Sequence, residues 1–117
     1  MSYVDCFVAA VPTENKEKYI EHANITAEIF KESGALEIVE NWGDDVPNGE
    51  VTSLPMAVKA KENETVVFSW VIWPSKETRD AGWGAMMEDP RMSPENNPMP
   101  FDGKRLIYGG FDMVLKA

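Results

Sequence analysis

The sequence contains very few residues that could form a disulfide or bind a metal ion. Cys6 is the only cysteine, so no disulfide can form within the chain. His22 is the only histidine, and these two residues cannot make a Cys/His zinc cluster. We therefore predict no metal site and no cofactor. On a strand where it alternates with Val4 and Val8, Cys6 is expected to be a buried, inert thiol.

Long apolar runs are also missing. The longest, residues 66–73, is too short to cross a membrane and is interrupted by Ser69. Residues 1–11 lack the basic segment and the following apolar run of a signal peptide. These absences predict a cytoplasmic protein with no membrane partner.

Positive charge is scarce as well. The chain has 11 lysine and arginine residues against 20 aspartate and glutamate residues, a formal net charge of −9 at pH 7. A surface this acidic repels the phosphate backbone of nucleic acids and anionic lipid headgroups. We therefore expect no nucleic-acid partner.

The 117 residues are typical of a single domain, which we place at residues 1–117. Runs rich in β-branched and aromatic residues predict four strands, at residues 3–11, 35–45, 65–73 and 104–115. Helical periodicity and end signals predict two helices, at residues 13–33 and 75–89, capped by Thr13 and Ser75. Gly34 would end the first helix. Residues 51–61 fit a strand or a short helix, and Pro55 favours the helix.

This element order, βαβ(α)βαβ, predicts an α+β, ferredoxin-like fold with a four-stranded antiparallel sheet. Strands 1 and 3 should be central, because they are apolar on both faces apart from Asp5 and Ser69. Two helices cover only one face of such a sheet, so the other face needs a cover. A homodimer that packs sheet against sheet would supply it. Ile25 and Ile29 form a second apolar stripe on the first helix, which a partner subunit could also cover.

Four stretches of the chain resemble the YbaA-like family of small bacterial proteins. They are the opening YVDCFVAAVP and residues 66–80, 86–92 and 99–111, and together they extend over nearly the whole chain. The resemblance implies a dimeric α+β barrel. Members of that superfamily include cofactor-free oxygenases, haem-degrading enzymes, lactone and dehalogenation enzymes, and plain binding proteins, and a fold does not choose among them.

The four tryptophans are candidates for the wall of an apolar ligand pocket. Trp70 and Trp73 should lie on opposite faces of their strand, since three positions separate them. Near Trp83, Gly82 and Gly84 would leave room for a ligand. Packing in the core and in a dimer interface is the alternative role for these side chains. The four are Trp42, Trp70, Trp73 and Trp83.

Three arginines are candidates for binding an anionic ligand. Arg79 and Arg91 could bind a carboxylate with two hydrogen bonds, or could form salt bridges with nearby acids. Arg105, beside Lys104, lies where this acidic chain would attract an anion. The following Gly109-Gly110 pair predicts a bulge or a close approach by backbone or ligand.

Proton transfer has two candidate residues, His22 and Tyr108. His22 is the only side chain whose ordinary pKa suits a base near pH 7, although its place on a helix flank beside Ile25 and Ile29 favours a packed interface or surface histidine. We thus predict a homodimer that binds a small apolar or aromatic carboxylate ligand in a Trp-lined pocket. A cofactor-free oxygenase or isomerase is one alternative, and a structural or regulatory dimer without a ligand is another.

Overall fold

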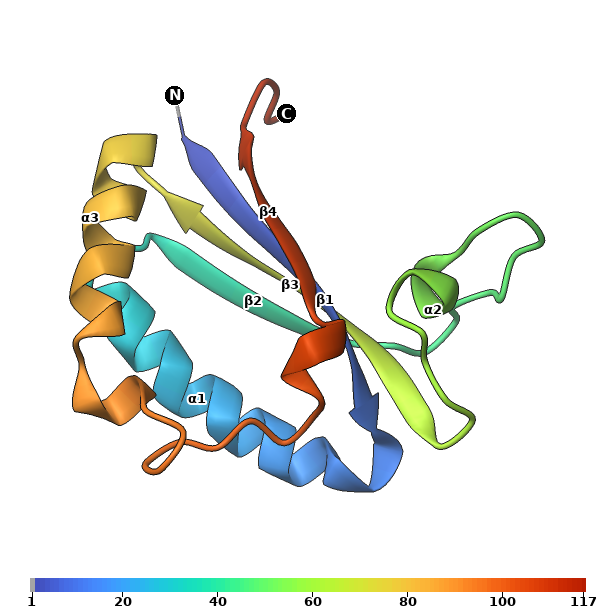
Figure 1. Ribbon diagram of the computed structural model, residues 1–117. Helices are drawn as coiled ribbons and strands as arrows, with labels where there is room; N and C mark the ends of the chain where they lie inside the picture. The colour runs from blue at the N-terminus through green and yellow to red at the C-terminus, as the bar shows by residue number, and fades with distance from the viewer. Residues whose placement is uncertain (1) are drawn as a thin grey trace.

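The computed structural model describes residues 2–117, in which four strands form one antiparallel sheet (Figure 1). The strands are β1 (Tyr3–Pro12), β2 (Glu37–Trp42), β3 (Glu64–Trp73) and β4 (Ile107–Asp112). Their order across the sheet is β2-β3-β1-β4. The predicted α+β class is therefore confirmed, with the two apolar strands in the centre and the two more polar strands at the edges.

The two long helices, α1 (Lys16–Glu32) and α3 (Lys76–Met87), cover one face of the sheet (Figure 1). The short helix α2 (Leu54–Ala57) lies on the other face, at one end. Three short 3-10 turns complete the regular structure: η1 (Thr13–Asn15), η2 (Pro90–Met92) and η3 (Gly103–Arg105).

Local end signals fix three of the predicted helix boundaries. The Ser75 hydroxyl accepts a hydrogen bond from the Thr78 backbone N–H, as expected of a helix cap. Ser53 caps α2 in the same way, and Pro55 lies in its first turn, so the preference for a helix in this segment is confirmed. Gly34 follows α1 with φ of +112°, a conformation that glycine adopts without strain.

The prediction that Thr13 caps the first helix is wrong. Residues 13–15 form the 3-10 turn η1, and the α-helix begins only at Lys16. The Thr13 hydroxyl is 2.7 Å from the Thr65 hydroxyl on β3, so it ties the turn to the sheet instead of capping the helix. The fourth strand also starts later than predicted, because the Asp102 carboxylate accepts from the Lys104 N–H and folds η3 ahead of it.

The helix-covered face of the sheet contains the main core. Tyr3, Phe30, Trp73 and Met86 are all buried there, in one cluster with Ile29. Ile29 is only 1% exposed, and Met92 of the same chain packs against this cluster. The apolar stripe on α1 is therefore covered at Ile29 from within the chain, and the expectation that it needs a partner is corrected there.

Within residues 2–117, the opposite face is covered where Val58, just after α2, packs on Val8, Ala10 and Val66. Beyond that end, apolar side chains of three strands remain half-buried or exposed. We call them the open sheet face: Val4, Cys6, Phe68, Trp70, Ile72 and Phe111. Cys6 is half-buried there, which corrects the expectation of a fully buried thiol.

Candidate functional site

A buried carboxylate on β1, that of Asp5, is surrounded by four hydrogen-bond donor groups. Asp5 is 3% exposed, although charged side chains are seldom buried unless they are paired. The indole N–H groups of Trp73 and Trp83 donate to Oδ2 at 2.9 and 3.0 Å. Arg79 donates from Nη2 to Oδ1 at 2.8 Å, and from Nε to both carboxylate oxygens at 3.1 to 3.2 Å. Bonding to Asp5 raises the pKa of the Arg79 guanidinium above its usual value.

The elements that bring these groups together are β1, β3 and α3. Trp73 ends β3 and pairs with Tyr3, two residues before Asp5. Arg79 and Trp83 are four residues apart on α3, so they lie on one helix face. Gly82 lets the helix approach the sheet, since a Cβ at that position would lie 2.7 Å from the Trp73 ring. The space that Gly82 leaves is therefore filled by Trp73.

Beside Asp5, three aromatic side chains form a surface that we call the aromatic edge: Phe7, Trp83 and Tyr108. The Phe7 ring centroid is 6.4 Å from the centroid of Trp83 and also 6.4 Å from that of Tyr108, which is inclined to it by 29°. Tyr108 is 75% exposed, whereas Phe7 and Trp83 are half-buried. The expectation of a bulge, or of a close approach by backbone or ligand, at Gly109-Gly110 is corrected: both glycines pair in regular register with β1, and the group that lies close to Gly110 is the Tyr3 side chain. The aromatic edge thus leaves part of the helix-covered face open to solvent.

The other two tryptophans lie away from Asp5. The Trp42 ring packs at 6.0 Å from the Tyr19 ring, with Lys16 Nζ 5.6 Å from its centroid. Trp70 belongs to the open sheet face, where Phe68 lies 6.2 Å away. The structure therefore brings together two of the four tryptophans and Arg79 from the predicted set. Asp5, which joins them, was not singled out as a site residue by the sequence pattern.

Arg91 binds carboxylates of its own chain. Its guanidinium contacts Glu32 at 2.8 and 3.0 Å and Asp89 at 2.7 Å. Hydrogen bonds from Arg91 lower the pKa of both carboxyl groups. Because both carboxylates bind it, Arg91 forms the salt bridges that the sequence offered as the alternative to ligand binding.

Arg105 is bound in a similar way, at the end of η3. It forms two hydrogen bonds of 2.7 Å with Glu64 and one of 3.0 Å with Asp102. This pairing lowers the pKa of Glu64. The guanidinium therefore joins η3 to the start of β3.

His22 lies in the wall of a pocket of about 480 Å³ between α1 and residues 96–100. Its Nδ1 is 2.9 Å from Oδ1 of Asn97, which is itself buried. Loss of water around the half-buried ring lowers the pKa of His22, and the hydrogen bond to Asn97 opposes this in part. The remaining wall residues are Asn15, Lys18, Glu21, Ile25, Asn96, Pro98, Met99 and Pro100.

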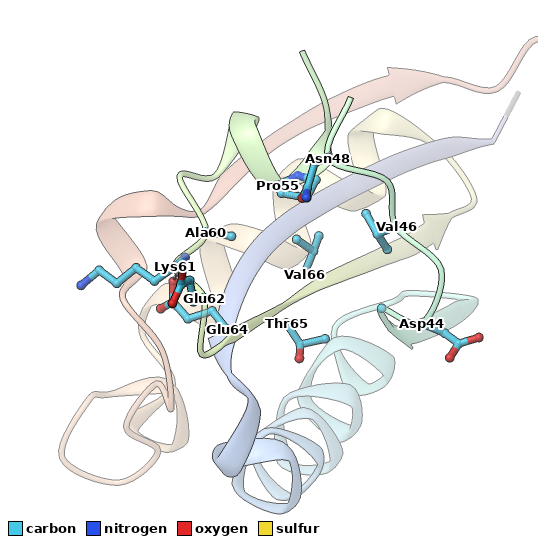
Figure 2. Close-up of a pocket in the computed structure, with 11 residues that line it drawn as sticks. Asp44, Val46, Asn48, Pro55, Ala60, Lys61, Glu62, Glu64, Thr65 and Val66 are labelled. Atoms are coloured by element: carbon cyan, nitrogen blue, oxygen red, sulfur yellow. Dashed lines mark hydrogen bonds between the residues drawn. The ribbon is translucent and has the colours of Figure 1, made fainter. Parts of the chain in front are cut away.

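A second pocket, of about 490 Å³, lies on the other face of the sheet between the β2–α2 loop and the start of β3. Figure 2 shows Val46, Pro55 and Val66 in its wall. None of the candidate site residues proposed from the sequence lines this pocket. Its charged wall residues are Asp44, Lys61, Glu62 and Glu64.

Residues 2–117 hold neither a metal-binding cluster nor a membrane-spanning helix. No group of three His, Cys, Asp or Glu side chains in this range is arranged to hold a metal ion. Within the same range, none of the helices combines the length and the apolar character needed to cross a membrane.

Comparison with known proteins identifies the family. Residues 2–103 match the model of a family described as "Protein of unknown function (DUF1428)". The chain is 59% identical over 115 residues to proteins named "Uncharacterized protein YbaA" from Escherichia coli strain K12 and from Shigella flexneri. Each alignment covers 98% of this chain and 98% of the relative. The resemblance drawn from the sequence motifs is confirmed, and the chain belongs to the DUF1428 family.

Proposed function

We propose that the protein is a homodimer that binds a small aromatic carboxylate at the aromatic edge of each subunit. The observation that carries this proposal is the partly open surface of Phe7, Trp83 and Tyr108, next to the guanidinium of Arg79. The exposed Tyr108 ring and the half-buried Phe7 ring, which is inclined to it by 29°, offer an apolar surface on which a ligand ring can stack. Trp83 connects the two parts, because it donates to the same Asp5 carboxylate as Arg79.

Arg79 supplies the group that would select a carboxylate. Asp5 holds its Nε and Nη2, whereas Nη1 bonds to Asp80 at 3.0 Å. The Asp80 side chain is 55% exposed, and an exposed ion pair of this kind contributes little to stability. A ligand carboxylate can therefore replace Asp80 at Nη1 while Asp5 keeps the guanidinium in place.

The open sheet face supports the homodimer. Apolar side chains from β1, β3 and β4 lie together there without a cover from residues 2–117, and monomers seldom expose large apolar patches. A second copy is the simplest occupant, because a two-fold axis buries the same patch of both subunits at once. The ligand surface stays free in this arrangement, because the aromatic edge is on the opposite face of the sheet.

The binding proposal is tested with phenylacetate and its uncharged analogue 2-phenylethanol. We expect phenylacetate to change tryptophan emission saturably and to raise the melting temperature, because a ligand that binds only the folded state stabilises it. Tyr108→Ala should weaken the binding of both compounds. Asp80→Asn should strengthen the binding of phenylacetate alone, because it removes the carboxylate that competes with phenylacetate for Arg79. Trp42→Phe, a substitution away from Asp5, is the matched control and should leave both affinities unchanged.

Two results would count against the proposal. Absence of a saturable signal with both compounds rejects binding at the aromatic edge. If phenylacetate and 2-phenylethanol bind with equal affinity, and Asp80→Asn changes neither affinity, Arg79 does not recognise the ligand carboxylate.

A further inference from the structure

A second site, independent of the aromatic edge, is built around His22. The Thr26 hydroxyl donates to the His22 backbone carbonyl at 2.7 Å, so its oxygen can accept from Asn97 Nδ2, 3.4 Å away. Asn97 then turns Oδ1 toward His22 Nδ1, at 2.9 Å. An amide oxygen only accepts hydrogen bonds, so Nδ1 carries the proton and Nε2 keeps a free lone pair.

The free nitrogen is not fully buried. Nε2 makes no hydrogen bond to any of residues 2–117. Every buried side-chain nitrogen or oxygen in that part of the chain has a partner, so Nε2 is not among the buried atoms. Asn97 therefore holds the ring through Nδ1, and Nε2 keeps some exposure to solvent beside the pocket that His22 lines.

The pocket next to His22 has the size and lining of a small-molecule site. Its volume is about 480 Å³, and Ile25, Pro98 and Met99 supply apolar surface. The titratable side chains of its wall are Lys18, Glu21 and His22. Since burial lowers the pKa of His22 below 6.5, the ring is a neutral base at pH 7, with the positive charge of Lys18 on the same wall.

We propose that this pocket is a proton-transfer site for small enolisable ketones, in which His22 is the catalytic base and Asn97 is a positioning residue. Nε2 takes a proton from the carbon next to the carbonyl. The C–H electron pair becomes the C=C bond of the enolate, and the carbonyl π electrons move to the carbonyl oxygen. The Lys18 ammonium stabilises the negative charge that develops on this oxygen. Return of the same proton to oxygen gives the enol. The step is an isomerisation, so it consumes no oxidant or reductant.

The lining of the pocket favours this chemistry over acyl transfer. No serine, threonine or cysteine is among its wall residues within the described part of the chain, so His22 has no hydroxyl or thiol there to activate. Transfer of a carbon-bound proton needs only a base near its working pH and a positive charge at the developing oxyanion. His22 and Lys18 supply these two groups.

The protonation state can be measured directly, because His22 is the only histidine and its ring NMR signals need no assignment. We expect ¹⁵N shifts of the Nδ1–H tautomer and a pKa below 6.5. Asn97→Leu should abolish the tautomer preference, and Asn97→Asp should restore it and raise the pKa, because a carboxylate also accepts from Nδ1 and attracts the imidazolium. An Nε2–H tautomer in the unsubstituted protein would overturn the assignment of the base.

Catalysis is tested by the keto–enol interconversion of phenylpyruvate and of oxaloacetate in a weakly basic buffer. We expect kcat/KM to rise with pH through the pKa of His22 and to fall about 100-fold or more in His22→Gln, within the usual range for a general base. Asn97→Leu should lower kcat more than it changes KM, and Asn97→Asp should recover part of it. Lys18→Met should also lower kcat, whereas Lys31→Met, on the last turn of α1, is the charge-matched control.

Failure to accelerate either ketone, or acceleration that His22→Gln leaves unchanged, would overturn the proposal. Neither result bears on phenylacetate binding, because the aromatic edge and the His22 pocket share no residue.

Discussion

Asp5 shows how one buried charge can organise the groups around it. A carboxylate taken out of water is stable only when its oxygens are fully hydrogen-bonded, and Asp5 receives donors from Trp73, Arg79 and Trp83. Removing the carboxylate would leave two indole N–H groups, and Nε and Nη2 of Arg79, without their partner. Asp5 therefore couples the end of β3 to α3.

We predict that Asp5→Ala lowers the free energy of unfolding by about 3 kcal/mol, the order expected when one partner of a buried ion pair is removed. Urea unfolding followed by tryptophan emission measures this change. Asp80→Ala removes the exposed partner of the same arginine and should cost less than about 0.5 kcal/mol. A similar decrease in the free energy of unfolding in both variants would show that the buried carboxylate contributes no more to stability than the exposed one.

Glu64 predicts a pH dependence at the scale of one ion pair. Hydrogen bonds from Arg105 lower the pKa of Glu64 below 4.5. The unfolded chain then takes up the proton first as pH falls, so the contribution of the pair is complete well above pH 4.5, decreases as pH falls below 4.5, and is lost once pH is below the lowered pKa of the folded state. Glu64→Gln should therefore lower the melting temperature at pH 7 but much less at pH 3. Glu62→Gln, an exposed substitution nearby, is the control, and an equal loss at both pH values would contradict the prediction.

At the scale of elements, α3 carries two glycines with opposite roles. A Cβ at Gly82 would lie 2.7 Å from the Trp73 ring and 2.8 Å from the Ser33 carbonyl oxygen, whereas a Cβ at Gly84 would meet nothing within 4 Å. The same helix thus contains one glycine required by packing and one that only weakens it.

We predict that Gly84→Ala stabilises the protein by about 0.5 to 1 kcal/mol through helix propensity. Gly82→Ala should destabilise it despite the same gain, because the Ser33 carbonyl and the Trp73 ring cannot both move aside. Thermal unfolding of the two variants beside the unsubstituted protein measures both signs. A stabilising Gly82→Ala would show that α3 is not tightly packed on the sheet.

Elements that depend on neighbouring residues could be predicted from the sequence, and contacts across the chain could not. Ser75 and Pro55 act on the turn that follows them, so their patterns were sufficient. Thr13 was misread because its partner, Thr65, is 52 residues away. The same limit applies to the sites: Trp83 is 78 residues from Asp5, and Asn97 is 75 residues from His22, separations that carry no spacing signal.

The whole molecule has one covered and one largely uncovered sheet face, and the single thiol lies on the uncovered one. Loss of water and the charge of Asp5 raise the pKa of Cys6, so its reaction with thiol reagents is slow even before any partner covers it. Cys6 is paired with Trp70 across β1 and β3, near the middle of the open sheet face. Its accessibility therefore reports whether that face is buried.

We predict a solution mass of about twice 13.1 kDa for the unsubstituted protein and of one chain for Trp70→Glu, because a charge in the interface would be buried without a partner. Light scattering at micromolar concentration measures the mass, and Cys6 should react with a thiol reagent at least about tenfold faster in the monomer. Tyr108→Glu, on the opposite face, is the matched control and should remain dimeric. A one-chain mass for the unsubstituted protein would contradict the homodimer.

The strand order also determines when, during synthesis, each strand can pair with its neighbours in the sheet. β1 is made first of the described elements, yet its neighbours are β3 and β4, and Tyr3 pairs with both Trp73 and Asp112. Until residue 112 has left the ribosome, one edge of this apolar strand has no hydrogen-bonding partner within the chain. Pairing so distant in sequence is slow, and an unpaired apolar edge can join a second nascent chain. The arrangement that centres the sheet on β1 therefore leaves the newly made protein prone to aggregation until β4 is added.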